Sequence, residues 1–261
     1  MDYDFFCSLG GSCAVSHQLK ERRLRVASLP FDWLFCVSDR TIEALTECFR
    51  NDFADWMRRG NLRELAAQER GQSTIFQCED TATGYRFIHD FHADPASGNE
   101  YDSVLAKYRR RIERLYEYLK KSQRIALLFD ADFELEPAKF ARLRQVLLDK
   151  FGPKTALDLH IVHFGAPRLE VECLDGMTIY HFPTSKHSYL YKYKCMEFSF
   201  LDDMRLTGAI PQPRGRGRRL EINRLPHGFR LILFRSRPLR FKAAVRIFRN
   251  WFEVVIGNLW E

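Results

Sequence analysis

Apolar and polar positions follow two alternating periods along the first two thirds of the chain, and these predict strands and helices in turn. Short apolar runs at 5–9, 124–130 and 157–164 predict strands. Between the last two runs a helix is predicted from Pro137, with an apolar face of Phe140, Leu143, Val146 and Leu147. A strand, a helix and a strand in this order form a crossover unit, so part of the sheet should be parallel and covered by helices.

Further patterns complete the predicted elements of this region. Residues 101–121 are predicted to form a helix with an apolar stripe of Val104, Leu105, Tyr108, Ile112, Leu115 and Leu119. Residues 40–68 are predicted as one or two helices, because apolar residues recur at helical spacing: Ile42, Leu45, Phe49, Phe53 and Trp56. Residues 73–91 are predicted as a hairpin that places alternate residues on one face: Tyr85, Phe87, His89 and Phe91. Several short strands are expected between 168 and 200.

These elements predict an α/β fold with a mixed, partly parallel sheet flanked by helices and a β-rich, basic C-terminal part. Residues 1–200 are expected to form the main domain, which carries the candidate site. Residues 201–261 are expected to form a basic extension packed on it. Proline and glycine predict a flexible loop at 211–219, and the segment from Phe241 has an apolar helical face.

The net charge of +7 is concentrated in one region of the 261-residue chain. The segment from Arg205 to Arg249 contains 13 Lys or Arg residues and one acidic residue, Glu221. Such a segment can bind nucleic acid, anionic lipid or an acidic polysaccharide. The candidate residues for an anionic ligand are Arg214, Arg216, Arg218 and Arg219. The alternative is that the arginines line the exposed face of strands, since they alternate with apolar residues at 231–234.

The cysteine pattern and the lack of targeting, nucleotide and metal motifs limit the classes of protein to which the chain can belong. The seven cysteines are an odd number without the paired short spacings of zinc sites or disulfide scaffolds, which favours reduced thiols. No apolar run resembles a signal-peptide core or a membrane span. We therefore expect a cytoplasmic protein. Nucleotide and metal motifs do not occur, so neither a cofactor nor a metal is expected.

Cys13 is the candidate nucleophile. The predicted first strand breaks at Gly10 and Gly11, and a helix is predicted directly after Cys13. The first turn of a helix directs main-chain N–H groups toward such a thiol, which lowers its pKa and favours the thiolate. The alternative is a small buried cysteine that only fills the core.

A cysteine nucleophile needs a general base, and His89 is the better candidate. It lies in an apolar strand pattern, where an unpartnered imidazole would be costly to bury. The alternative for His89 is a core histidine bonded to a main-chain carbonyl. His17, one turn after Cys13 on the predicted helix, is the less favoured base because residues four apart meet along the helix surface.

Three aspartates are candidates for the residue that orients the base. Asp32 lies between two aromatic residues, where it is either paired, for instance with Arg25, or functional. Asp130 ends a predicted central strand, where α/β sheets present functional groups, although it can equally be a loop or capping carboxylate. Asp90 is adjacent to His89 but should point to the opposite face unless the strand bulges.

Two classes of function remain open on the residues alone. In the first, Cys13 attacks an amide, ester or thioester and His89 transfers the proton. In the second, the protein is non-catalytic or processes sugars and binds a saccharide or polyanion near Asp130. Residues 130–132 have a weak similarity to the Asp-x-Asp metal site of many glycosyltransferases.

Three segments together resemble a bacterial family classed as papain-like cysteine peptidases of unknown function. They are 8–13 (SLGGSC), 28–33 (SLPFDW) and 87–91 (FIHDF), followed by an arginine-rich helix at 108–112. The similarity covers residues 4–130. It implies Cys13 as the nucleophile, His89 as its base and an acidic third residue, with a peptide or other acyl substrate for a hydrolase or acyl transferase. It also makes an α+β papain-like fold the alternative to the α/β fold.

Overall fold

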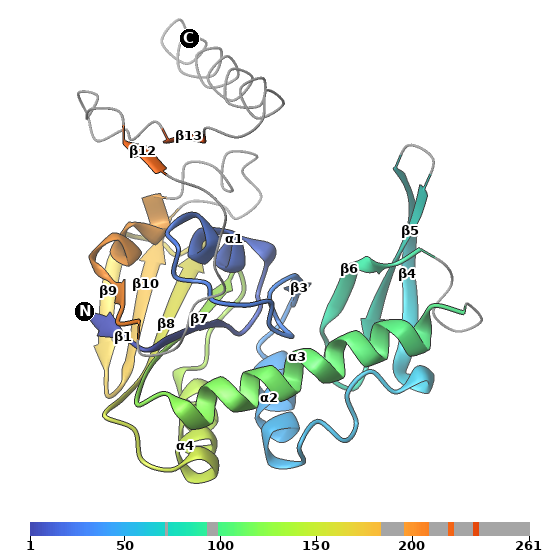
Figure 1. Ribbon diagram of the computed structural model, residues 1–261, viewed down its shortest axis with the longest axis horizontal. Coiled ribbons are helices and arrows are strands. Elements are labelled where there is room, and N and C mark those ends of the chain that lie inside the picture. The colour runs from blue at the N-terminus through green and yellow to red at the C-terminus, as the bar shows by residue number, and fades with distance from the viewer. Residues whose placement is uncertain (71–72, 93–98, 184–195, 209–218, 222–231, 235–261) are drawn as a thin grey trace, which may run out of the picture. The chain divides into compact units, whose positions relative to one another are not determined.

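The computed structural model describes residues 1–70, 73–92, 99–183, 196–208, 219–221 and 232–234 (Figure 1). The chain divides into two compact units, Met1–Pro211 and Gln212–Glu261. In the second unit, the described elements are strands β12 (Arg219–Glu221) and β13 (Ile232–Phe234), which pair antiparallel.

The centre of the first unit is a five-stranded sheet. Its strands are β2 (Phe5–Ser8), β7 (Arg124–Ala131), β8 (Ala156–Phe164), β10 (Met177–Phe182) and β9 (Glu170–Leu174), in that spatial order. The first four are parallel, and β9 runs antiparallel beside β10. The sheet is therefore mixed and mostly parallel, which confirms the predicted α/β class.

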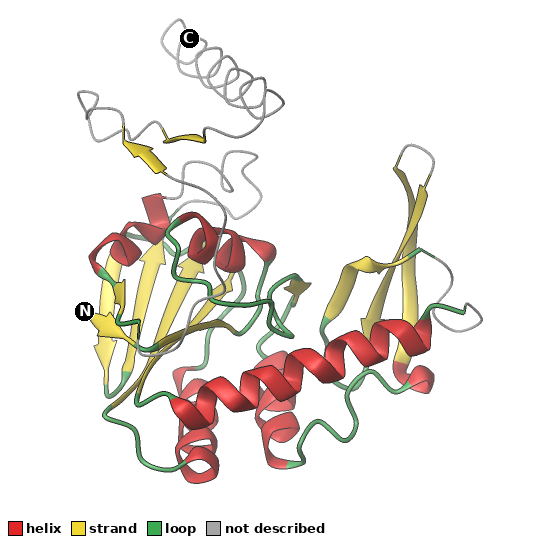
Figure 2. Ribbon diagram, in the orientation of Figure 1, coloured by secondary structure: helices red, strands yellow, loops and turns green. Residues whose placement is uncertain are grey.

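Helices cover both faces of this sheet, as Figure 2 shows. Successive residues of β7 point to opposite faces, and each face has its own apolar core. Ile125, Leu127 and Phe129 belong to the core shared with α2 (Arg40–Arg50), α3 (Tyr101–Lys121) and α4 (Pro137–Phe151). Ala126 and Leu128 belong to the core shared with α1 (Cys13–Glu21) and the 3-10 segment η2 (Met196–Asp203). The predicted helix over 101–121 is confirmed at both ends.

A second, antiparallel sheet lies beside the first. Its order is β3 (Leu34–Phe35), β6 (Arg86–Phe91), β5 (Ser73–Asp80) and β4 (Leu62–Arg70). β5 and β6 form the predicted hairpin. A short parallel pair, β1 (Asp2–Tyr3) and β11 (Arg205–Leu206), completes the described strands of the first unit.

The prediction of helices over 40–68 is wrong in its second half. Helix α2 ends at Arg50, and residues 62–70 form strand β4. The chain turns between them through left-handed backbone angles at Asp52, Phe53 and Met57. The aromatic residues read as a helical stripe instead pack in a cluster around Phe31, which contacts Phe49, Phe53 and Trp56.

Some predictions fall outside the described residues. These are the flexible loop at 211–218, including Arg214, Arg216 and Arg218, and the helix from Phe241. Within the part of the chain that the structure describes, no helix has both the length and the apolar composition needed to cross a membrane.

A buried polar network lies on the α1 face of the main sheet. Tyr3 Oη donates to Asp158 Oδ2 at 2.7 Å and lies 3.3 Å from His160 Nε2, while Tyr180 Oη lies 3.4 Å from His160 Nδ1. His160 is 3% exposed, and burial lowers its pKa from 6.5 to about 4. The folded protein therefore holds this imidazole in its neutral form at neutral pH.

His160 is expected to destabilise the protein in mild acid. Below pH 6.5 the unfolded chain binds a proton at this residue that the folded chain does not bind until about pH 4. The stability contribution is thus complete above pH 6.5 and declines toward pH 4, by about 2 kcal/mol at pH 5. Urea unfolding of wild type and His160→Gln between pH 5 and 8 measures it. Equal pH slopes in the two proteins would contradict the prediction.

Candidate active site

Cys13 is the first residue of α1, directly after the loop that leaves β2. The loop turns through left-handed backbone angles, with φ of 92° at Gly10 and 93° at Gly11. Ser12 is the N-cap of the helix, and its Oγ accepts a hydrogen bond from the Ala14 N–H at 3.1 Å. Cys13 is 7% exposed, more than Cys7, Cys36, Cys48 or Cys78. The predicted strand, glycine turn and helix are therefore all present around this thiol.

Asp130 accepts a hydrogen bond from Ser12, the N-cap residue of this helix. It lies next to the end of β7, is completely buried, and its Oδ2 accepts a hydrogen bond from Ser12 Oγ at 2.7 Å. Because Ser12 Oγ also caps α1, one carboxylate on the sheet fixes the start of the helix that begins with Cys13. Ser12 was not among the residues singled out from the sequence, although a serine before a predicted helix is a capping signal.

Gly11 lies against the main chain of Asp130. A Cβ atom at this position would be 2.0 Å from the carbonyl oxygen of Asp130 and 2.3 Å from its Oδ1. The positive φ of Gly11 also disfavours any residue with a side chain. The close approach of the cysteine loop to β7 therefore requires glycine here.

Substitution of Gly11 with alanine is expected to displace the cysteine loop and to lower the free energy of unfolding by at least about 2 kcal/mol. Gly60→Ala is the matched control, because no atom lies within 4 Å of its Cβ position. Urea unfolding measures both variants. Equal stabilities of the two variants would show that the loop does not depend on this contact.

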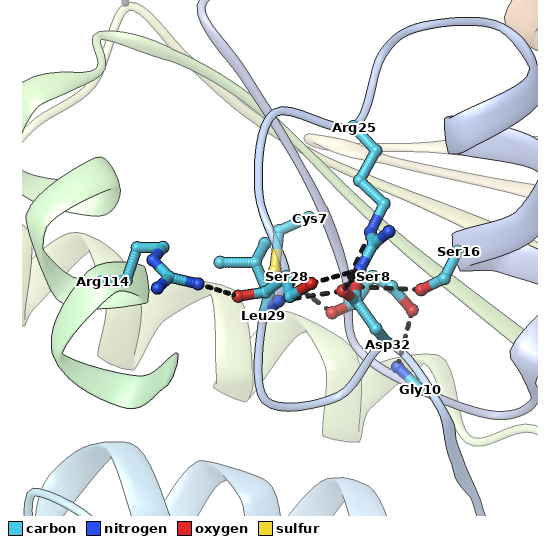
Figure 3. A network of polar contacts seen from close by, with 9 residues as sticks. All are labelled: Cys7, Ser8, Gly10, Ser16, Arg25, Ser28, Leu29, Asp32 and Arg114. Carbon is cyan, nitrogen blue, oxygen red and sulfur yellow. Dashed lines mark hydrogen bonds and ion pairs between the residues drawn. The ribbon is translucent and has the colours of Figure 1, made fainter. Parts of the chain in front are cut away.

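Asp32 links α1 to the loop that follows it (Figure 3). Its Oδ2 accepts hydrogen bonds from Arg25 Nε at 2.9 Å, Arg25 Nη2 at 2.5 Å and the Leu29 N–H at 2.8 Å. Its Oδ1 accepts a hydrogen bond from Ser16 Oγ at 2.9 Å, and Ser16 lies one turn after Cys13 on α1. The side chain of Asp32 is 1% exposed. The structure thus contains the Arg25 pairing that the sequence left open.

Arginine side chains connect the same loop to α3. Arg114 Nη1 donates to the carbonyl oxygen of Ser28 at 2.7 Å, and Arg25 Nη2 donates to Ser28 Oγ at 3.0 Å (Figure 3). The polar network therefore runs from α1 through Asp32 and Ser28 to α3.

His89 lies on an irregular part of β6. Phe87 pairs with Cys78 of β5, and Phe91 pairs with Phe76. The two pairs are therefore four residues apart on β6 but only two residues apart on β5. The extra residues form a bulge around His89, and bulges redirect side chains. Phe87 and Phe91 are buried, whereas His89 is exposed. The expectation that His89 is buried on one face with its neighbours is wrong, because the alternation is interrupted at this point.

Asp90 is bonded to α3. Its carboxylate accepts hydrogen bonds from Lys107 Nζ at 2.6 Å and Tyr108 Oη at 2.8 Å. Burial, and then the charge of Asp90, raise the pKa of Tyr108. Both of these partners belong to the long helix, so Asp90 attaches β6 to α3.

Two contacts tie β6 to the cysteine loop. Tyr85, just before β6, donates from its Oη to the carbonyl oxygen of Leu9 at 2.6 Å. The short strand β3 pairs with β6, and the next residue, Cys36, donates its N–H to the carbonyl oxygen of Gly11 at 3.3 Å. Strand β6, which carries His89, is thus fastened to the loop that carries Cys13.

A pocket opens near the carboxyl end of β7, lined by Ser38, Asp39, Phe133, Glu134 and Glu136. Within the described ranges, no group of three or more histidine, cysteine or acidic side chains is arranged to hold a metal ion. His17, the less favoured base, lies half-buried on α1.

Sequence comparison shows the family of this chain. The chain belongs to the family described as "Putative papain-like cysteine peptidase", whose sequence model matches residues 4–162. A relative is an uncharacterised protein of Acanthamoeba polyphaga mimivirus, 26% identical over 153 residues. The match covers 52% of this chain and 65% of the viral protein, which is less than two thirds of that protein's length. No solved structure matches the chain. Since this relative is viral, a bacterial origin stays a prediction.

Proposed function

We propose that the protein is a cysteine-dependent hydrolase of papain-like peptidase type that acts on an amide, ester or thioester. The observation that carries this proposal is the position of Cys13 at the start of α1, in a glycine loop anchored by Asp130. The family match over residues 4–162 supports it. A peptide is the substrate that the family description favours.

In the proposed reaction, His89 accepts the proton of Cys13 and the thiolate attacks the carbonyl carbon of the substrate. A carbon–sulfur bond forms, and the carbonyl electrons move to the oxygen. Ala14 already donates its N–H to Ser12 Oγ, so the N–H groups proposed to stabilise the oxyanion precede it in the loop. The carbonyl then re-forms as the bond to the leaving group breaks, and His89 passes the proton to that group. Water hydrolyses the resulting thioester, which breaks the carbon–sulfur bond, releases the carboxylic acid and restores the Cys13 thiol.

The aspartates are proposed to act through other residues. Asp130 positions Cys13 through Ser12, and Asp32 positions the same helix through Ser16. Asp90 positions β6 through its bonds to α3. Each carboxylate thus has a supporting role, and the acidic residue proposed to orient His89 is one of these three.

The other buried thiols make Cys13 distinguishable in an experiment. Burial raises the pKa of Cys7, and it raises the pKa of Cys48 and of Cys78 to about 12. These thiols are therefore weak nucleophiles at neutral pH. Cys173, by contrast, is exposed and serves as a reference for an accessible thiol.

Alkylation by iodoacetamide at pH 6.5, followed residue by residue with mass spectrometry, tests the proposed pair. Cys13 should react faster than Cys173 although it is far less exposed, because His89 favours the thiolate. His89→Ala should slow the alkylation of Cys13 about tenfold and leave that of Cys173 unchanged. His92→Ala is the matched control, since His92 is another exposed histidine close to the end of β6. A Cys13 rate that His89→Ala does not change would exclude His89 as the base.

Two further assignments also belong to this proposal. We propose that the basic segment, including Arg214, Arg216, Arg218 and Arg219, binds an anionic ligand, which the 13 basic residues between 205 and 249 support. A cytoplasmic location is proposed on the cysteine pattern.

A further inference from the structure

The side chain of Tyr85 joins the strand that carries His89 to the loop that carries Cys13. Tyr85 lies directly before β6, and its Oη donates to the carbonyl oxygen of Leu9 at 2.6 Å. Both of these residues are buried. Leu9 precedes Cys13 by four positions, and Tyr85 precedes His89 by four positions as well. This hydrogen bond therefore closes a short path along the chain between the two residues of the proposed pair.

The ring of Tyr85 also packs against the first glycine of the cysteine loop. A Cβ atom at Gly10 would lie 2.8 Å from Tyr85 Cε1. The same ring stacks on Phe31, with centroids 5.6 Å apart and 25° between the ring planes. It meets Trp56 at 60°, also with centroids 5.6 Å apart. The aromatic cluster thus fixes the phenol ring in the position from which its hydroxyl group reaches Leu9.

The main chain of Tyr85 is fixed by the turn between β5 and β6. Its N–H donates to Thr83 Oγ1 at 3.3 Å, and its carbonyl oxygen accepts from the Asp80 N–H at 2.9 Å. The buried carboxylate of Asp80 in turn accepts from the N–H groups of Met57 at 3.0 Å and Ala82 at 3.1 Å. The start of β6 is therefore held in place at the residue that contacts the cysteine loop.

Leu9 is held from two sides. Its N–H donates to the carbonyl oxygen of Leu128 on β7 at 2.7 Å, and its own carbonyl oxygen accepts from Tyr85. Burial raises the pKa of Tyr85, so the hydroxyl group keeps its proton and donates at neutral pH. The contact from the Cys36 N–H to Gly11 joins main-chain atoms at both ends, so a side-chain substitution does not remove it. The bond from Tyr85, by contrast, can be removed by taking away one oxygen atom.

We propose that Tyr85 is a positioning residue that sets the distance between Cys13 and His89. It acts through its hydrogen bond to Leu9. This inference rests on the proposed function, because it assigns how the Cys13–His89 pair is assembled. Without the hydroxyl group, the buried carbonyl oxygen of Leu9 loses its donor, and the loop and β6 lose a contact that keeps them together. His89 should then stabilise the thiolate of Cys13 less well.

Alkylation of Cys13 by iodoacetamide between pH 5 and 9 tests this role in Tyr85→Phe. The rate at pH 6.5 should fall about fivefold, and the apparent pKa of the Cys13 profile should rise by about 0.7, because a smaller fraction of the thiol is ionised. Tyr101→Phe is the matched control, since Tyr101 Oη donates to the carbonyl oxygen of Met57 at 2.8 Å in the same apolar core. This variant should lose a similar amount of stability toward urea and keep the wild-type profile.

The combination of Tyr85→Phe with His89→Ala separates this proposal from the proposed function. In the His89→Ala background, Tyr85→Phe should change the Cys13 rate by less than about twofold, because the tyrosine acts through the pair. The positioning role is overturned if Tyr85→Phe leaves the wild-type profile unchanged, if it slows Cys13 equally in both backgrounds, or if Tyr101→Phe has the same effect. A Cys13 rate that His89→Ala alone does not change would exclude the proposed base, and with it the pair that Tyr85 is proposed to position.

Discussion

Replacement of Cys13 with alanine is expected to abolish formation of a covalent acyl-enzyme. In the wild type, p-nitrophenyl acetate should acetylate Cys13, and the modification should be detected by intact-protein mass spectrometry and located by peptide mapping. Without the thiol, the rate of p-nitrophenol release should fall to the uncatalysed background, on the order of 10³-fold or more. The reason is that Cys13 supplies the attacking thiolate in the proposed mechanism, whereas the neighbouring hydroxyls of Ser12 and Ser16 donate to Asp130 and Asp32.

Cys173→Ala is the matched control for this substitution. Cys173 is exposed on β9, so its removal takes away an accessible thiol without changing the cysteine loop. That variant should keep the wild-type rate and the acetylation of Cys13. Unchanged p-nitrophenol release in Cys13→Ala, with unfolding by urea also unchanged, would exclude Cys13 as the nucleophile.

Replacement of Asp32 with alanine is expected to lower the free energy of unfolding by about 3–5 kcal/mol. The substitution leaves Arg25, the Leu29 N–H and Ser16 without the carboxylate that they share in a buried site. Urea unfolding followed by circular dichroism measures this change. Asp32→Asn should lose less stability than Asp32→Ala, because the amide oxygen can still accept part of these hydrogen bonds.

Asp55→Ala is the control, because it removes an exposed aspartate rather than a buried one. Asp55 pairs with Arg58 at the surface, where both side chains are about half exposed, so the expected change stays within about 0.5 kcal/mol. If Asp32→Ala were as mild as Asp55→Ala, the network in Figure 3 would not be what holds α1 in place.

The strands of the main sheet and the helices that cover it were predictable because apolar residues recur in each element with the period of that element. The stripe over 101–121 and the apolar runs of β7 and β8 correspond to elements that bury one face or both. Strand β4 was missed because its sequence is rich in leucine, glutamate, alanine and glutamine, which favour helices. It becomes a strand through pairing with β5, and no local pattern reveals such a partner.

The candidate site was predictable only in part. The glycine turn and the helix after it indicate the position of Cys13, because both are local features. The exposure of His89 depends on a register irregularity between β5 and β6, which the alternation of residues cannot show. The partners of the aspartates come from distant parts of the chain, as with Ser12 and Asp130, which are 118 positions apart.

The hydrogen bond between Ser12 and Asp130 links the reactivity of Cys13 to the packing of the main sheet. Because the start of α1 is attached to an inner strand of the sheet, a change in the packing of β7 is expected to change the position and the reactivity of Cys13 as well. The alkylation rate of Cys13 would then report whether the main sheet is correctly packed. Variants selected for low reactivity could therefore include many that leave the site residues untouched and alter only the packing beneath them.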